Sequence, residues 1–142
     1  MKRAFFIIFG LFIFAQFIQT DKTNSQSDPK LEIETPQNIA QIFKSSCYDC
    51  HSNETIWPIY SYVAPMSWSI KSHVENGRNA LNFSIWNSYE EAKKQKLQKE
   101  IFRTIYASMP PKSYIAFHKE ADLSKEQREQ VRNWLISIGV KP

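Results

Sequence analysis

Cys47-Tyr48-Asp49-Cys50-His51 is the segment around which the rest of the chain is organised. It holds both cysteines of the 142-residue chain and one of its three histidines. Before it, Ile39, Ile42 and Phe43 recur at helical spacing after Thr35-Pro36, a pair typical of a helix start with proline in the first turn. This spacing predicts a helix that runs straight into the motif.

A lone Cys-x-x-Cys pair is compatible with four chemistries: haem attachment, a redox dithiol, half of a zinc site, or a bare disulfide. A structural zinc site usually needs four Cys or His ligands, which the motif with His73 and His118 could barely supply. A thioredoxin-like dithiol belongs to a βαβ unit, and no sheet is predicted here. A disulfide would be strained in a helix and would leave His51 without a role.

Haem attachment uses all three reactive side chains of the motif. It needs one thiol for each porphyrin vinyl group, and an imidazole next in sequence that reaches the iron from the same side. Cys47, Cys50 and His51 meet that demand. We therefore predict one haem c, covalently attached through Cys47 and Cys50, with His51 as an iron ligand.

The second axial position of the iron has four candidates: Met109, His73, His118 and Met66. A methionine thioether raises the reduction potential and suits electron transfer, whereas a second histidine lowers it. We prefer Met109, because it follows a predicted helix and precedes Pro110-Pro111, a rigid turn that could aim the sulfur at the iron. The other three also have ordinary explanations, as a half-buried helix residue, a surface residue and a core residue respectively.

The remaining pattern predicts an all-α domain, since the chain has only three glycines and no alternating β-branched runs. Residues 56–65 predict a loop, followed by a helix from Ser67 to about Asn76 that ends at Gly77. Two capping boxes, which begin at Ser88 and at Ser124, predict two further helices. The first of these helices is expected to end near Pro110-Pro111, and its inward-facing residues to be Leu97, Ile101, Phe102 and Ile105. The second is expected to end before Gly139, and its inward-facing residues to be Val131, Trp134, Leu135 and Ile138.

The amino terminus is typical of an export segment. Lys2-Arg3 precedes an apolar run from Ala4 to Ile18, which is short for a span of about 20 residues. No small-x-small cleavage site follows, so we expect an uncleaved anchor helix over residues 1–20, with a cleaved signal peptide as the alternative. The basic pair places the amino terminus in the cytoplasm. Residues 21–34 then form a flexible tether, and 35–142 a domain on the periplasmic side of the inner membrane, or free in the periplasm after cleavage.

Charge and composition argue against several classes of function. The formal net charge is +4, part of which comes from Lys2 and Arg3, so the domain lacks the basic footprint of a nucleic-acid-binding protein. The carboxylates form no recognisable pair with a nucleophile or metal motif, and we expect no enzyme. No small-molecule substrate and no particular redox partner can be identified.

Several further blocks resemble the bacterial haem-binding domain family over about residues 35 to 138. The resemblance rests on Cys47–His51, Trp57-Pro58-x-Tyr60, Pro65, Ser67-Trp68, His73-Val74-x-x-Gly77-Arg78, Leu81-Asn82-Phe83-Ser84-x-Trp86, Met109-Pro110-Pro111, Tyr114, His118, Leu123-Ser124 and Trp134.

This resemblance implies a monohaem c-type domain with a small cytochrome c-like helical fold, exported and often tethered by an amino-terminal hydrophobic segment. It implies a family-specific role for residues 73–86, such as covering the haem edge or holding a propionate through Arg78. Trp68 belongs to a set of aromatic residues that we expect first in the core and secondly in the haem-pocket wall.

Two functions follow from these expectations. With His51 and Met109 both on the iron, the domain would be an electron-transfer module. With an open or exchangeable sixth position, it would be a haem-based ligand sensor or a weak peroxidase.

Overall fold

Helices supply all the regular structure in residues 1–141, the part of the chain that the computed structural model describes, and no strand occurs among them. The predicted all-α class is therefore confirmed. The α-helices are α1 (Lys2–Ala15), α2 (Gln37–Ser46), α3 (Tyr48–His51), α4 (Met66–Ala80), α5 (Glu91–Ala107), α6 (Lys112–Ile115) and α7 (Lys125–Ser137), and the short 3₁₀ helices are η1 (Ile59–Tyr62), η2 (Phe83–Ser88) and η3 (Lys119–Ala121).

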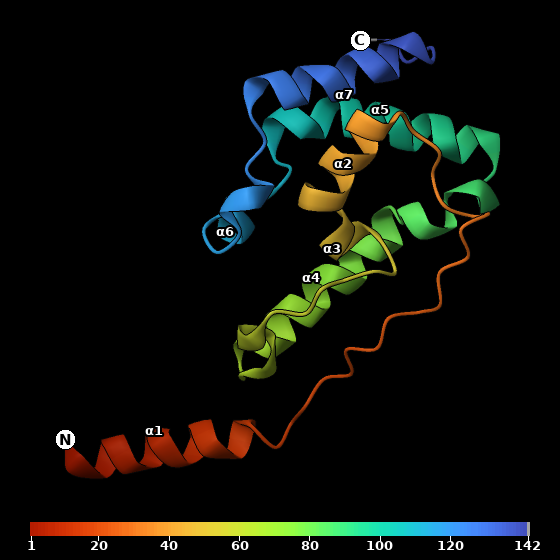
Figure 1. Ribbon diagram of the computed structural model, residues 1–142. Helices are drawn as coiled ribbons and strands as arrows, with labels where there is room; N and C mark the ends of the chain where they lie inside the picture. The colour runs from red at the N-terminus through yellow and green to blue at the C-terminus, as the bar shows by residue number, and fades with distance from the viewer. Residues whose placement is uncertain (142) are drawn as a thin grey trace.

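The helices form two groups that meet at the cysteine motif. In Figure 1, α5 and α7 run side by side, α2 lies against them, and α4 crosses below, with α3 between α2 and α4. The motif does not continue α2 as one straight helix. The backbone departs from helical geometry at Cys47, and α3 is a separate turn that presents the rest of the motif.

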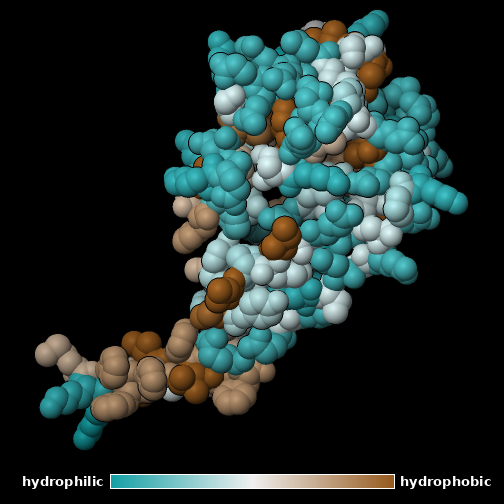
Figure 2. Space-filling view, in the orientation of Figure 1, coloured by the Kyte–Doolittle hydropathy of each residue, from teal (hydrophilic) through white to brown (hydrophobic). Residues whose placement is uncertain are grey.

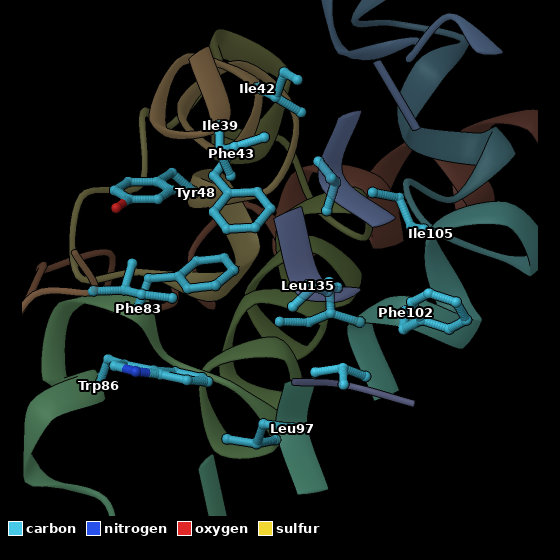
Figure 3. Packing of buried hydrophobic residues seen from close by; sticks show 14 of the residues in the cluster. Ile39, Ile42, Phe43, Tyr48, Phe83, Trp86, Leu97, Phe102, Ile105 and Leu135 are labelled. Carbon is cyan, nitrogen blue, oxygen red and sulfur yellow. The ribbon is translucent and has the colours of Figure 1, made fainter. Parts of the chain in front are cut away.

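The core lies between α2, α5 and α7. Phe43 stacks on Phe83 at 4.8 Å between ring centroids, and Tyr48 also stacks on Phe83, at 5.5 Å (Figure 3). The inward-facing residues predicted for α5 are confirmed, as are Val131 and Leu135 of α7. Ile138 is 46% exposed, which corrects the prediction, because the helix ends there and Ile138 is its C-cap.

Helix α4 is longer than predicted. It continues through Gly77 to Ala80, and Gly77 keeps a negative φ, unlike Gly139 after α7, whose φ is 97°. A side chain at Gly77 would collide with α3, since an added Cβ would lie 2.4 Å from the carbonyl oxygen of Cys50. Gly77 therefore permits close packing of two helices and does not end one.

Only one of the two predicted capping boxes is formed. Ser124 accepts from the backbone N–H of Gln127, whose side chain in turn accepts from the backbone N–H of Ser124. Ser88 instead ends η2 and donates to the carbonyl oxygen of Ile85. Helix α5 begins three residues later, at Glu91, without a side-chain cap.

The amino-terminal segment differs from expectation in two ways. Helix α1 has 14 residues, and no helix among residues 1–141 combines the length and apolar character needed to cross a membrane, so the expected anchor helix is unsupported. The following chain runs back along the domain (Figure 1) and is bonded to it: Gln16 exchanges hydrogen bonds with the backbone of Ala64, and Asn24 donates to the carbonyl oxygen of Thr55.

The folded core also begins earlier than residue 35. Ile33 is buried in the core cluster, and its backbone N–H donates to the carbonyl oxygen of Phe83 at 3.0 Å. Ile33, which the sequence analysis placed in the tether, thus packs with the core of the domain.

Candidate functional site

His51 is held by its Nδ1 atom. This nitrogen lies 3.0 Å from the carbonyl oxygen of Gly77 and 3.1 Å from that of Leu81. Since carbonyl oxygens only accept, Nδ1 carries the proton and Nε2 keeps a free lone pair. Burial lowers the pKa of His51, although the two hydrogen bonds act in the opposite direction. A neutral imidazole with Nε2 available is the form that binds a metal.

The two cysteines lie on the same short segment and are not bonded to each other. Burial raises the pKa of Cys47 to about 12 and that of Cys50 to about 11. Both are therefore thiols near neutral pH. A redox-active dithiol requires a lowered pKa on one sulfur, and this pair lacks it.

A hollow runs past the motif and consists of three adjoining cavities. The central cavity, of about 300 Å³, is bordered by Cys47, Cys50 and His51 of the motif and by Met109, Pro110 and Pro111 of the turn after α5. The Phe83 cavity, of about 260 Å³, shares Cys47, His51 and Met109 with it. The Trp57 cavity, of about 240 Å³, shares Asp49, Cys50 and Tyr114 with it. Figure 2 shows a dark hollow in the middle of the domain, below the polar upper part.

The two outer cavities differ in their walls. The Phe83 cavity is lined by core residues from several helices, among them Phe43, Phe83, Leu97, Ile101 and Leu123. The Trp57 cavity is lined by aromatic residues with polar atoms, namely Trp57, Tyr60 and Tyr114, together with aliphatic residues of α4. Together the three cavities fall in the size range of cofactor sites.

Met109 lies where the sequence analysis placed it, just beyond α5, and it borders both the central and the Phe83 cavities. Its backbone N–H donates to the carbonyl oxygen of Thr104, and its own carbonyl oxygen accepts from Arg128 at 2.8 Å. The same guanidinium donates to the carbonyl oxygens of Ile105 and Leu123. Arg128 thus fixes the turn that carries Met109.

The other three candidate ligands do not all border the same cavities. His73 borders the central and the Trp57 cavities from α4, and Met66 borders only the Trp57 cavity. His118 accepts from or donates to the Tyr60 hydroxyl at 2.5 Å through Nε2, and its Nδ1 lies 3.1 Å from Glu120. Among these three, His73 is the one beside the motif.

Arg78 and Trp68 do not border the three cavities. The guanidinium of Arg78 donates to the carbonyl oxygen of Ser52, to Thr55 Oγ1 and to Asn24 Oδ1. The indole of Trp68 donates to the carbonyl oxygen of Ile18 at 2.9 Å. In this structure both side chains connect the domain to neighbouring loops and to the amino-terminal segment.

Sequence reasoning missed two features of the site. The hydroxyl of Tyr114 donates to the Asp49 carboxylate at 2.6 Å, which joins α6 to the centre of the motif. The indole Nε1 of Trp57 is buried without a hydrogen-bond partner among the described residues. Tyr114 was visible only as a member of a family-like block, and Trp57 also as one of the aromatic residues expected in the core or the haem-pocket wall. No spacing in the sequence indicated the roles found here.

The donor set fits a haem. It offers one imidazole with a free Nε2, two thiols and a thioether, which all border one largely apolar hollow. No group of three or more His, Cys, Asp or Glu side chains within residues 1–141 could hold a metal ion, so a four-ligand zinc site is not formed there.

An all-helical domain in which two cysteines and a histidine border a largely apolar hollow is a cofactor-binding domain of the haem type. The sequence model of the family described as the haem-binding domain matches residues 10–137, and the chain belongs to that family. Comparison with curated proteins and with solved structures finds no match.

Proposed function

We propose that this domain carries one covalently attached haem c and transfers electrons, with His51 and Met109 as the two iron ligands. The haem would supply a reversible one-electron change at iron. The protein would supply the attachment, both axial ligands and a hollow that limits access of water.

The observation that carries this proposal is the orientation of His51. Both hydrogen bonds of its Nδ1 go to main-chain carbonyls of α4 and the residue that follows it, so the ring cannot turn without losing them. Fixing one nitrogen of an imidazole in this way sets both the tautomer and the direction of the metal-binding nitrogen. His51 also borders the central cavity, where a ligand to iron is needed.

Covalent attachment is supported by the position of the thiols. Cys47 borders the central and Phe83 cavities, and Cys50 borders the central and Trp57 cavities. Both cysteines therefore border the central cavity, and each also borders a different outer cavity. Each can meet one vinyl group of a porphyrin lying in the hollow, with addition of the thiol S–H across the vinyl double bond.

Ligation by Met109 is supported by its place on the same cavity as the motif. The central cavity is bordered both by the motif and by the turn from Met109 to Pro111. A thioether in that position raises the reduction potential, which suits an electron carrier. With both axial positions filled, no substrate would reach the iron, and we expect no enzymatic activity.

A second function stays in consideration because the side chain of Met109 is 38% exposed. A ligand at the surface can be displaced, so a haem-based sensor or a weak peroxidase with an exchangeable sixth position is the alternative.

Export and a site of action on the periplasmic side of the inner membrane are part of the proposal. They are supported by the order of Lys2-Arg3 and the apolar run after it, and by the need to attach haem c outside the cytoplasm. Whether the apolar segment is retained as an anchor or removed decides between membrane attachment and a free periplasmic protein. The redox partner would be another protein.

The proposed function is tested on the exported protein. We expect haem that stays on the chain under denaturing conditions, and a low-spin ferrous spectrum of the c type. Replacing both cysteines (Cys47→Ser with Cys50→Ser) should abolish the retained haem. Met109→Ala should give a high-spin spectrum and a markedly lower potential, with attachment intact.

The matched control is Met66→Ala, which removes a methionine of similar exposure from a different cavity and should leave spectrum and potential unchanged. An unchanged spectrum in Met109→Ala would refute ligation by Met109. A wild-type protein with five-coordinate iron that binds carbon monoxide readily would favour the sensor.

A further inference from the structure

We propose that the domain rests on a phospholipid bilayer through the exposed side of the loop that contains η1. This η1 face consists of Ile59, Tyr62 and Val63, which lie between the cysteine motif and α4. The proposal deepens the proposed export by naming a lipid-binding surface on the domain itself. It rests on that export, with the apolar amino-terminal segment retained, and it does not depend on the haem.

The sequence around the η1 face lacks charge. Residues 55–70 contain no Asp, Glu, Lys or Arg, and this is the longest uncharged stretch of the chain after residue 20. Its aromatic residues are Trp57, Tyr60, Tyr62 and Trp68. Tryptophan and tyrosine are enriched where a protein meets the boundary between lipid and water, because each combines an apolar ring with a polar atom. The composition of this stretch therefore suits the surface of a bilayer.

The side chains of the η1 face are not covered by the described part of the chain. Ile59 is 89% exposed, and Tyr62 and Val63 are about half exposed. None of the three borders the central, Phe83 or Trp57 cavity, so a haem in the hollow would not cover them. Phe117, which is also exposed, extends the apolar surface, since its ring packs against Tyr60 at 5.4 Å between centroids. Single exposed apolar residues are common, but a group of them on one loop indicates a contact surface.

Hydrogen bonds tie this loop to the segment that follows α1. The side-chain amide of Gln16 donates to the carbonyl oxygen of Ala64 at 3.2 Å and accepts from the backbone N–H of Ala64 at 3.0 Å. The indole of Trp68 donates to the carbonyl oxygen of Ile18 at 2.9 Å. In Figure 1 the amino-terminal end of α4 accordingly points toward α1. The loop therefore lies beside the carboxyl end of α1.

Helix α1 indicates what covers the η1 face. None of its residues is buried, and the large apolar side chains that it exposes are Phe5, Phe6, Ile7, Ile8, Phe9, Leu11, Phe12, Ile13 and Phe14. Because these positions are nearly consecutive, they cover every side of the helix, and Figure 2 shows brown and tan side chains over its length. A helix that is apolar all round needs an apolar surrounding, which for an exported segment is lipid.

A bilayer explains both surfaces, and a protein partner explains only one. Since the η1 face is tied to the end of α1, a bilayer that takes up α1 also meets Ile59, Tyr62 and Val63. The argument needs α1 to enter the bilayer and does not need it to cross. A protein bound to the η1 face alone would leave the apolar surface of α1 in water, which is unfavourable.

The experiment places the photoreactive residue p-benzoylphenylalanine at position 59 in the exported full chain, held in vesicles of phosphatidylethanolamine and phosphatidylglycerol. Irradiation joins this side chain to whatever lies next to it. We expect phospholipid adducts, identified by mass, in several-fold higher yield at Ile59 and at Val63 than at Ile136. Ile136 is the matched control, because it is an exposed isoleucine of α7, at the end of the domain away from α1 (Figure 1).

Three results would overturn the proposal. One is an equal yield of lipid adducts at positions 59 and 136. Another is a position 59 that joins to a different protein or to a second copy of the chain, and not to lipid, in native membranes. The third is a mature chain that has lost α1 and stays free of the vesicles. Haem retention in the same sample separates the two proposals: retained haem without lipid adducts contradicts only the η1 face, and lipid adducts without retained haem contradict only the attachment.

Discussion

The hydroxyl of Tyr114 lies 2.6 Å from Oδ2 of Asp49 and is the side-chain hydrogen bond that connects α6 with the middle of the cysteine motif. Tyr114 follows Met109 by five residues, across Pro110-Pro111, and Asp49 lies between Cys47 and Cys50. The bond therefore links the motif with the segment that follows Met109, and both of these border the central cavity. Burial, followed by the bond to Asp49, raises the pKa of Tyr114, so the phenol stays protonated and donates at physiological pH.

Tyr114→Phe should loosen the segment that carries Met109 without preventing haem attachment. Loss of a hydrogen bond to a carboxylate should lower the free energy of unfolding by about 1 to 2 kcal/mol. Carbon monoxide should also bind more tightly, because the thioether is displaced more easily. Urea unfolding and carbon monoxide titration measure the two effects. Tyr106→Phe, an exposed hydroxyl 3.5 Å from its acceptor, is the control, and an equal effect in both variants would contradict the prediction.

Gly77→Ala should reduce the yield of haem-loaded protein. Alanine favours a helix interior over glycine by about 1 kcal/mol, but the added Cβ would lie 2.4 Å from the Cys50 carbonyl oxygen, and overpacking typically costs about 1 to 3 kcal/mol. The clash is with backbone and cannot be relieved by turning a side chain. Retained haem per exported chain is the measurement. Gly10→Ala, where nothing lies within 4 Å, should match the wild type.

Arg128→Gln should free the turn that carries Met109. The guanidinium serves the carbonyl oxygens of Ile105, Leu123 and Met109, and a shorter amide cannot reach all three. We expect unfolding free energy to fall by about 2 kcal/mol. We also expect the ferric spectrum to show a larger high-spin fraction. Arg103→Gln, at an exposed position paired with Glu100, is the control. A purely low-spin spectrum in Arg128→Gln would refute a role in positioning the sulfur.

Ser124→Ala and Ser88→Ala should differ, although both serines begin the same sequence pattern. Removal of the formed cap at Ser124 should cost about 1 kcal/mol of unfolding free energy. Ser88 caps no helix, and its exposed hydroxyl bonds only the carbonyl of Ile85, so its removal should cost less than about 0.5 kcal/mol. Urea midpoints of the two variants test this, and equal losses would contradict the structure.

The sequence predicted the helical class and most of the core because periodic apolar residues determine which helix face is buried. Leu97, Ile101 and Ile105 illustrate this. The residues that mark helix ends predicted less, since one residue type can serve several purposes. Glycine can end a helix or allow close packing, and at Gly77 it does the second, because α3 lies against α4 there. That contact joins residues 27 apart and leaves no trace in local spacing.

The site was predictable where chemistry is local and not where it depends on packing. Cys47, Cys50 and His51 are neighbours in the chain, so their joint role is visible as a motif. Met109 could be proposed as the second iron ligand because it follows a helix end and precedes two prolines. The contacts of Arg78, by contrast, depend on packing, because its acceptors in Ser52, Thr55 and Asn24 lie 26, 23 and 54 residues away in the sequence.

The acceptors of the His51 Nδ1–H are main-chain carbonyls, and this has a consequence for the electronic character of the imidazole. A carboxylate acceptor pulls the proton away and gives the ring imidazolate character, which pushes electron density onto a bound metal and favours its higher oxidation states. The carbonyl dipoles of Gly77 and Leu81 are neutral and do this only weakly. Since both are backbone groups, no single side-chain replacement can convert them into an anionic partner. The neutral acceptors therefore support the proposed electron-transfer role over the alternative of a weak peroxidase.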